Sequence, residues 1–273
     1  MDTKVAIITG SGSGIGRAIA LKFAGAGYAV VINDVVRAAG ESVLSEIQKE
    51  KGKGLFVLAD VSDVSQVRSM FEEAKKSWGR VDVLVNNAGV PGAFSLIVDM
   101  PDDTWQKTIS IHLNGTFYCL REAAKLMMVA GFGRIINIAS IAGILGTVGS
   151  GEYGAAKAGI INLTRTAAKE LGPYHITVNA IAPGMVATPT NLKLKEKGSP
   201  FIEIAEKGTP TGRMTSPEEI AELVLLISSE AAGNMNGQVI RLDGGAAIEM
   251  SMDQFMRDFL VKKSPFIKSF RGD

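Results

Sequence analysis

The chain has 273 residues, of which 46% are hydrophobic and 21% charged, and this balance excludes disordered, collagen-like and coiled-coil proteins. Its 29 Lys and Arg against 28 Asp and Glu give a net charge of +1, less positive than general nucleic-acid or membrane-surface binders carry. A single cysteine, Cys119, excludes an intramolecular disulfide and a thiolate zinc cage. Only two histidines are present, so we expect no metal centre.

The start of the chain does not have the pattern of a secretory signal. Lys4 is followed directly by Val5–Thr9, which predicts a buried strand. The longest uncharged stretch, residues 135–151, is interrupted by Asn, Ser and Gly and makes a poor membrane span. We therefore expect a cytoplasmic protein with no nucleic-acid or membrane partner.

Short β-branched runs alternate along the chain with segments of helical spacing. The predicted strands are Val5–Thr9, Ala29–Asn33, Gly54–Ala59, Val81–Val85, Arg134–Ala139, Thr177–Ile181 and Gln238–Leu242. The predicted helices are Arg17–Ala26, Ala38–Lys51, Ser65–Trp78, Asp103–Val129, Tyr153–Leu171 and Pro217–Ser228. The strand runs are almost wholly apolar, as in parallel sheets covered on both faces.

This alternation predicts one α/β domain, residues 1–248, with a doubly wound sheet of about seven parallel strands and helices on both faces. Residues 189–215 fall outside the alternation and are expected to form a lid over a pocket. Residues 249–273 are expected to form a C-terminal helical extension.

The first predicted strand runs into a glycine-rich loop with the spacing T-G-x-x-x-G-x-G. Glycines allow close backbone approach to a pyrophosphate, and the N-terminus of the following helix attracts it. No Gly-Lys-Ser/Thr ending follows, which excludes the nucleoside triphosphatase loop. The loop predicts a dinucleotide site of the Rossmann type, and its expected contacts are Gly10, Ser13, Gly14, Ile15 and Gly16.

Asp34 ends the second predicted strand about 20 residues beyond the glycine loop, the distance expected of an acid that binds the adenosine ribose. A carboxylate there accepts hydrogen bonds from the ribose hydroxyls and repels a 2′-phosphate. The sequence therefore favours NAD, with NADP as the weaker alternative because Arg37 is close by in the sequence.

Further motifs follow in order: Asn86–Gly89 after the fourth strand, Ser140 at the end of the fifth, and Tyr153-x-x-x-Lys157 on a helix. Together with the glycine loop they resemble the short-chain dehydrogenase/reductase family over residues 3–247, near its 3-oxoacyl-[acyl-carrier-protein] reductase and NAD-dependent alcohol dehydrogenase branch. The resemblance implies a Rossmann-type fold, metal-free hydride transfer at a CH–OH group, and a homotetramer or homodimer.

Tyr153 and Lys157 are four residues apart on a predicted helix and so share one face. A phenol titrates near about pH 10, and a nearby ammonium lowers that pKa, so we expect Tyr153 to be the general acid/base. The resemblance adds Ser140 as the group that holds the substrate oxygen, and Asn114 as the group that positions a water linked to Lys157. It also places Lys157 on the nicotinamide ribose. His112 is expected to be a core or interface histidine.

The remaining expected contacts come from the resemblance and lie mainly after the predicted strands. The other cofactor contacts are Asp60, Val61, Asn87, Ala88, Gly89, Pro183, Gly184, Val186 and Thr188, besides Tyr153 and Lys157. The expected substrate contacts are Ser140, Ala142, Leu145, Ser150, Tyr153 and Met185. In the predicted lid, Lys193, Lys195 and Lys197 do not share a helix face, which favours a solvated surface over an anion site.

The sequence favours an NAD-dependent enzyme that interconverts a secondary alcohol and a ketone. The alternative is an NADP-dependent reductase of a 3-oxoacyl thioester of acyl carrier protein or CoA. Carrier-protein reductases usually have basic residues before the fifth and sixth strands, where this chain has Val129–Phe132 and Pro173–His175. A serine hydrolase is disfavoured because no G-x-S-x-G surrounds Ser140. A dinucleotide sensor without turnover is a remote alternative, since such sensors usually lack part of the catalytic set.

The predicted C-terminal extension has the pattern of an amphipathic helix. Ser251 resembles its cap, and Pro265 is expected to end it. Its expected apolar face consists of Met252, Phe255, Met256, Phe259 and Leu260. We expect this face to pack on a neighbouring subunit or over the pocket, with docking on its own domain as the alternative.

Overall fold

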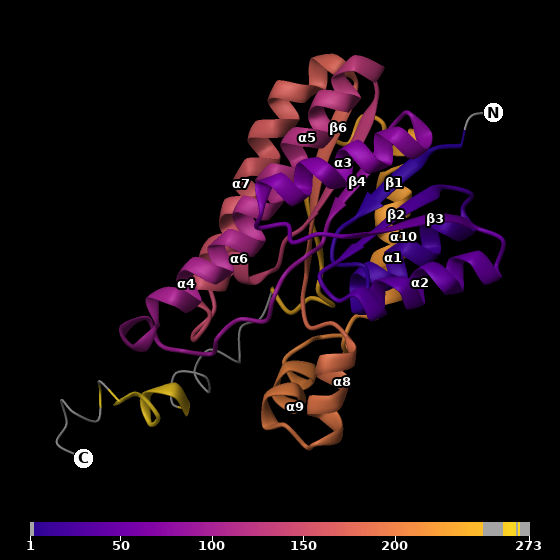
Figure 1. Ribbon diagram of the computed structural model, residues 1–273. Coiled ribbons are helices and arrows are strands. Elements are labelled where there is room, and N and C mark those ends of the chain that lie inside the picture. The colour runs from indigo at the N-terminus through magenta and orange to yellow at the C-terminus, as the bar shows by residue number, and fades with distance from the viewer. Residues whose placement is uncertain (1–2, 248–258, 266, 268–273) are drawn as a thin grey trace.

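The computed structural model describes residues 3–247, 259–265 and 267. Its centre is one seven-stranded sheet in which all neighbours are parallel, in the order β3-β2-β1-β4-β5-β6-β7 (Figure 1). The strands are β1 (Val5–Ile8), β2 (Ala29–Asp34), β3 (Lys53–Leu58), β4 (Val83–Asn86), β5 (Gly133–Ile138), β6 (Ile176–Pro183) and β7 (Val239–Leu242). The predicted doubly wound sheet of seven parallel strands is confirmed.

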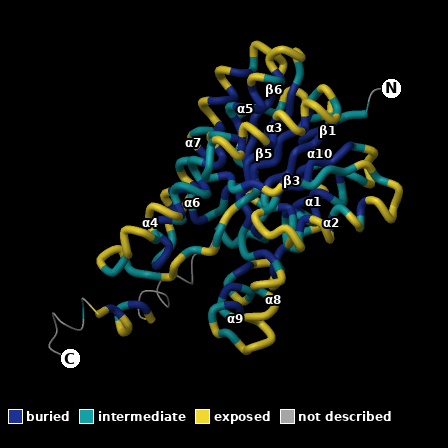
Figure 2. The backbone as a smooth tube through the Cα atoms, viewed as in Figure 1, coloured by how far each residue is buried: buried dark blue, intermediate teal, exposed yellow. Residues whose placement is uncertain are grey.

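Helices cover both faces of the sheet. On one face lie α1 (Gly14–Gly25), α2 (Arg37–Lys49) and α10 (Pro217–Ile227), and on the other α3 (Val64–Trp78), α5 (Gly115–Ala130) and α7 (Gly151–Leu171). In β1, Ile7 belongs to the core beneath α3, α5 and α7, whereas Ile8 packs with α1, α2 and α10. Successive strand residues point to opposite faces, so two covered faces require the continuous apolar strands seen in the sequence. Figure 2 shows this buried centre in dark blue.

The strand order reverses at β1, which pairs with β2 on one side and β4 on the other. The crossovers leave this point in opposite directions, so a crevice opens outside the carboxyl ends of these strands. The loops after β1, β2 and β4 meet there, and they carry the glycine-rich motif, Asp34 and Asn87.

The predicted helix Asp103–Val129 is not one regular α-helix, and that prediction was wrong. The structure has α4 (Asp102–Ile109), a π-helical turn at Ser110–Asn114, and then α5. The backbone stays in the right-handed helical region through this turn, with φ −61° and ψ −45° at Ser110 and φ −66° and ψ −41° at Asn114. Hydrophobic spacing therefore continues across the turn and cannot reveal it, although π turns often occur at functional sites.

The predicted lid contains two helices, α8 (Pro189–Glu196) and α9 (Pro200–Lys207), which extend away from the sheet (Figure 1). Each begins with a proline in its first turn, where a missing N–H is tolerated. A salt bridge of 2.8 Å joins Lys195 to Glu206 across the helix pair. The other short elements are α6 (Ala142–Leu145) and turns at Ile97–Asp99, Gly172–Tyr174 and Glu230–Ala232.

Much of the predicted C-terminal extension, including Ser251, Met252, Phe255 and Met256, lies outside the described residues. Phe259–Val261 is helical, and Leu260 and Ser264 are buried. This helical stretch ends before Pro265, as predicted, and beyond it Ser264 Oγ accepts a hydrogen bond of 3.2 Å from Ile267 N. Within the described part of the chain, no helix is long and apolar enough to cross a bilayer.

Candidate active site

The glycine-rich loop lies against the turn after β4, and two of its glycines are required by close backbone contact. A Cβ at Gly10, where φ is +61°, would lie 2.7 Å from Ala88 Cα. A Cβ at Gly16 would lie 2.2 Å from the carbonyl oxygen of Gly10. Asn87 Nδ2 donates to the carbonyl oxygens of Thr9 and Gly10 at 2.9 and 3.0 Å. The Asn87 side chain therefore clamps the loop.

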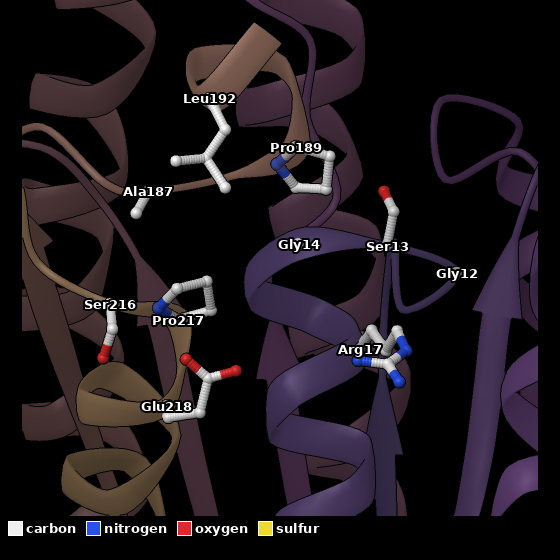
Figure 3. A pocket seen from close by; sticks show the side chains of 10 residues that line it. All are labelled: Gly12, Ser13, Gly14, Arg17, Ala187, Pro189, Leu192, Ser216, Pro217 and Glu218. Atoms are coloured by element: carbon white, nitrogen blue, oxygen red, sulfur yellow. The ribbon is translucent and has the colours of Figure 1, made fainter. Parts of the chain in front are cut away.

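The N-terminus of α1 opens onto a cleft of about 540 Å³ (Figure 3). Pro189 and Leu192 lie across this cleft from Ser13 and Gly14. Ser13 is the N-cap residue but its side chain makes no capping hydrogen bond, so the first N–H groups of the helix depend on another acceptor. A helix start with this geometry favours a phosphate group. The remaining lining residues are Gly12, Arg17, Ala187, Ser216, Pro217 and Glu218.

Asp34 is fixed at the rim of the glycine loop. One carboxylate oxygen accepts the Gly12 N–H and the other the Val36 N–H, each at 2.9 Å. The arginines nearest in sequence are each paired with a glutamate: Arg17 with Glu46, and Arg37 with Glu41 at 3.2 Å. The carboxylate thus dominates the charge at this corner.

The expected contacts after β3 and β6 surround the same crevice. Asp60 Oδ1 accepts the N–H and the hydroxyl of Ser62 at 2.8 and 2.7 Å, and the neighbouring Val61 is buried. A Cβ at Gly14 would lie 3.5 Å from Thr188 Cγ2, so the segment after β6 lies over the glycine loop. The other expected contacts on this segment are Pro183 at the end of β6, Gly184 beside Asp243, and Val186, which bridges to Thr215.

Ser140, Tyr153 and Lys157 come together beside β5. Lys157 is 4% exposed, and its Nζ donates to the Ile138 carbonyl oxygen at 2.7 Å. The same Nζ lies 5.5 Å from the centroid of the Tyr153 ring. The Ser140 hydroxyl hydrogen-bonds Tyr153 and accepts the Ala142 N–H at 3.2 Å. The arrangement can bind a carbonyl oxygen and deliver a proton to it.

Burial controls the protonation of this group. It raises the pKa of the Tyr153 phenol, and the hydrogen bond from Ser140 opposes that rise. Burial also lowers the pKa of Lys157 to about 7. Removal from water penalises both charged forms, tyrosinate and ammonium. We expected Lys157 to lower the pKa of Tyr153. In the structure burial has the larger effect, and the pKa is raised.

The residue that contacts Tyr153 from the π turn is His112, two positions before the expected Asn114. The two rings are edge to face, with centroids 5.3 Å apart and an interplanar angle of 89°. His112 is 3% exposed, as expected for a core histidine, but sequence reasoning missed its contact with Tyr153. Asn114 is partly buried at the end of the turn. One signal in the sequence could have indicated this contact: one of only two histidines lies two positions before the expected catalytic residue Asn114.

The expected substrate residues lie on two sides of the site. Ala142 and Ser150 are buried near Tyr153, and Leu145 is exposed at the rim. Met185 lies opposite, on the segment after β6, where its sulfur is 3.3 Å from Asn191 Nδ2.

A second residue that the sequence did not indicate is Glu152. It is fully buried directly before Tyr153, and its Oε1 accepts the Ala93 N–H at 2.7 Å. Ser95 also forms a bridge with Ser150. These contacts hold the segment 90–95 beside Tyr153.

Two aromatic rings and the C-terminal segment add apolar surface to the rim. Phe94 and Phe201 meet edge to face with centroids 5.2 Å apart. A Cβ at Gly149 would lie 2.4 Å from Leu260 Cδ1, so the C-terminal segment contacts the loop that leads into α7. Within the described residues, no group of three His, Cys, Asp or Glu side chains could hold a metal ion.

Comparison with known proteins agrees with this geometry. Residues 10–247 match the family described as Enoyl-(Acyl carrier protein) reductase. The chain is 38% identical, over 91% of its length and 99% of the relative's, to "3-oxoacyl-[acyl-carrier-protein] reductase FabG" of Thermotoga maritima. It is also 38% identical, over 91% of its length and 98% of the relative's, to "(2S)-[(R)-hydroxy(phenyl)methyl]succinyl-CoA dehydrogenase subunit BbsD" of Thauera aromatica.

Among solved structures, the crystal structure of gox2181 superposes with a TM-score of 0.87 at 31% identity, covering 91% of this chain and 97% of that one. The glycine loop and the Ser140–Tyr153–Lys157 group both lie within residues 10–247, the part of the chain that the family model matches. The chain belongs to the short-chain dehydrogenase/reductase family.

Proposed function

We propose that this protein interconverts a 3-oxoacyl thioester and the corresponding 3-hydroxyacyl thioester, with NAD(H) as the hydride carrier. The observation that carries the reaction type is the Ser140–Tyr153–Lys157 group beside a glycine-lined helix start. One relative is named as a reductase of a 3-oxoacyl carrier protein and the other as a dehydrogenase of a substituted succinyl-CoA, and both names favour a thioester substrate. This substrate replaces the simple secondary alcohol that the sequence alone favoured.

The rim of the site supports an acyl substrate. Ile97, beside Gly151 at the start of α7, is 82% exposed, and Leu192 on the wall of the cleft and the expected substrate contact Leu145 are also exposed. Exposed apolar side chains that border a site favour an apolar ligand or partner. An acyl chain that leaves the crevice would cover such side chains.

CoA is favoured over acyl carrier protein as the thioester's carrier. Val129, before β5, is 91% exposed where carrier-protein reductases usually have a basic residue. The nearby Arg134 is buried, and its Nη1 donates to the carbonyl oxygens of Gly133 and His175 at 2.8 and 3.3 Å. This edge therefore offers little positive charge to an acidic carrier protein.

The corner around Asp34 favours NAD over NADP. A dinucleotide 2′-phosphate would approach a carboxylate that two backbone N–H groups already hold in place. Both nearby arginines are occupied by glutamates. When bound, the reduced dinucleotide supplies the hydride that the carbonyl carbon accepts.

The residues of the chain supply the proton and the orientation. The Ser140 hydroxyl donates to the substrate carbonyl oxygen, and Tyr153 delivers its phenolic proton to that oxygen as negative charge develops there. The raised pKa of Tyr153 keeps the phenol protonated at neutral pH, which suits reduction of the ketone. Lys157, with a pKa of about 7, can return a proton to the tyrosinate.

The test is a reductase assay of the purified protein with NADH and with NADPH. The substrates are acetoacetyl-CoA, acetoacetyl-acyl carrier protein and a simple methyl ketone, and Tyr153→Phe is the control. We expect turnover of acetoacetyl-CoA with NADH that disappears in the variant. Faster turnover of the methyl ketone than of the thioesters would show that the substrate is a simple secondary alcohol or its ketone. Activity with NADPH alone would overturn the Asp34 argument, and tight dinucleotide binding without any turnover would support a sensor.

A further inference from the structure

The imidazole of His112 lies between the acid/base and the turn that forms the cofactor floor. The ring meets that of Tyr153 at 5.3 Å between centroids and an angle of 89°, a favourable T-shaped geometry. On its other side, Nε2 is 3.0 Å from Val90 N and 2.9 Å from Val90 O. Gly89 leaves the necessary room, since a Cβ there would lie 2.2 Å from His112 Cε1. We propose that His112 is a positioning residue, which fixes the ring of Tyr153 and couples it to the backbone at Val90.

This inference rests on the proposed role of Tyr153 as the acid/base, but on no particular substrate. Packing alone does not account for a histidine at this position. Its Nδ1 is buried and has no hydrogen-bond partner among the residues that the structure describes, which is unfavourable for the folded state. A phenylalanine would fill the space and avoid that unpaired atom, but it could not hydrogen-bond Val90. The polar edge toward Val90 and the aromatic edge toward Tyr153 together require an imidazole.

The ring performs this role as a neutral group. Burial and the charge of Lys157 lower the pKa of His112 to about 3, while the hydrogen bond with Val90 opposes that shift. The ionisable groups of α7 beside it are Tyr153 and Lys157, and residues 86–90 of the facing turn contain no ionisable side chain. The imidazole therefore adds no second positive charge beside Lys157 at neutral pH.

Val90 also begins the segment 90–95 on the substrate side. Glu152 holds the same segment at Ala93, with an Oε1–N distance of 2.7 Å. His112 and Glu152 thus fasten the segment at two points, and both lie next to Tyr153. A change at His112 should move the tyrosine relative to the cofactor floor and the substrate segment together.

The experiment uses two substitutions that separate the two edges of the ring. His112→Phe keeps an aromatic ring against Tyr153 and loses the hydrogen bond that Nε2 makes with the Val90 backbone. His112→Gln can still reach Val90 and loses the ring. The control is His175→Asn at the other histidine, which is exposed with φ +58°, a conformation that Asn tolerates.

We expect kcat to fall about 10- to 100-fold in both variants, with KM changed by less than about threefold, because misplaced reacting groups slow the chemical step. The pKa of Tyr153 is read from tyrosinate absorbance, as the difference between each variant and the same variant carrying Tyr153→Phe. His112→Phe should keep the raised pKa because the ring still excludes water, whereas His112→Gln should lower it. His175→Asn should change neither quantity.

The inference is overturned if both variants retain wild-type kcat and Tyr153 pKa and lose only thermal stability. Should His112→Phe not fold, His112→Gln alone carries the test. The tyrosinate titration needs no substrate, so it remains decisive if acetoacetyl-CoA is not turned over. A failure of the thioester proposal and a failure of the His112 inference therefore give different results.

Discussion

Lys157 Nζ lies 5.5 Å from the centroid of the Tyr153 ring, and the two residues lie one turn apart on α7, with Lys157 buried and Tyr153 half-buried. The ammonium is anchored by the Ile138 carbonyl oxygen at 2.7 Å. Burial moves the two pKa values apart: it raises that of Tyr153 and lowers that of Lys157 to about 7. The result is a phenol that stays protonated at neutral pH beside an amine that exchanges its proton there.

The first prediction concerns stability against pH. The folded pKa of Lys157 is about 7, below its ordinary value of 10.5, so between these values the unfolded chain binds more protons than the folded one. The free energy of unfolding should therefore rise as pH increases from about 7 toward 10. Below pH 7 the destabilisation caused by burying Lys157 is fully present. Lys157→Met should show a smaller rise in Tm between pH 6 and 9 than the wild type. Parallel curves would contradict the pKa assignment.

The second prediction concerns the proton donor and its neighbour. Tyr153→Phe removes the transferable proton and should lower kcat about 100- to 10,000-fold. Ser140→Ala removes the hydroxyl that bonds Tyr153 and that we propose bonds the substrate oxygen, and should lower kcat by a similar or smaller factor. Dinucleotide affinity, measured by calorimetry, should change little in Ser140→Ala. An intact kcat in either variant would rule out the proposed proton path.

The third prediction concerns cofactor preference. Asp34→Asn keeps the shape and one acceptor for the backbone N–H groups of Gly12 and Val36, but removes the negative charge. It should raise the kcat/KM ratio of NADPH to NADH by about tenfold or more, because unit charges near a protein surface interact by a few kcal/mol. The matched variant Glu41→Gln releases Arg37 and should improve NADPH use without a loss with NADH. An unchanged ratio in Asp34→Asn would mean that another group selects the cofactor.

The elements and motifs that depend on local pattern were predictable from the sequence. The apolar strands, the glycine loop and the Tyr153-x-x-x-Lys157 pair each have a pattern that a fixed spacing reveals, and the sheet order confirmed the fold they predicted. The π turn was not predictable, because its residues stay in helical conformation and keep the apolar spacing. The helices α8 and α9 were missed because their segment is polar and reads as a loop.

The contacts of His112 and Glu152 depend on tertiary packing rather than spacing. His112 meets Tyr153 across 41 positions of the chain, and Glu152 meets Ala93 across 59. No local pattern encodes such a pair, and a buried acid or histidine in a helix looks like any polar residue until its neighbours are placed. The direction of the Tyr153 pKa shift was unpredictable for the same reason, since burial outweighs the lysine only in the folded site.

The fourth prediction concerns the substrate segment. Glu152→Gln keeps an oxygen that can accept the Ala93 N–H, whereas Glu152→Ala leaves that N–H without its acceptor. We expect Glu152→Gln to keep the KM for acetoacetyl-CoA near the wild-type value and Glu152→Ala to raise it about tenfold, which corresponds to about 1.4 kcal/mol, within the net range of a typical hydrogen bond. Equal KM values in the two variants would show that the segment is held by other contacts.

The fifth prediction concerns the C-terminal segment. Leu260 is 6% exposed and contacts Gly149, whose loop leads into Ser150 and Tyr153. Leu260→Asp places a charge in this apolar contact and should release the segment from the rim. The KM for a long-chain 3-oxoacyl-CoA should then rise more than the KM for acetoacetyl-CoA, because only the longer chain reaches the rim. Phe259→Asp is the matched control, since Phe259 is 42% exposed on the same turn. Equal effects of the two variants on both substrates would show that the segment does not border the acyl path.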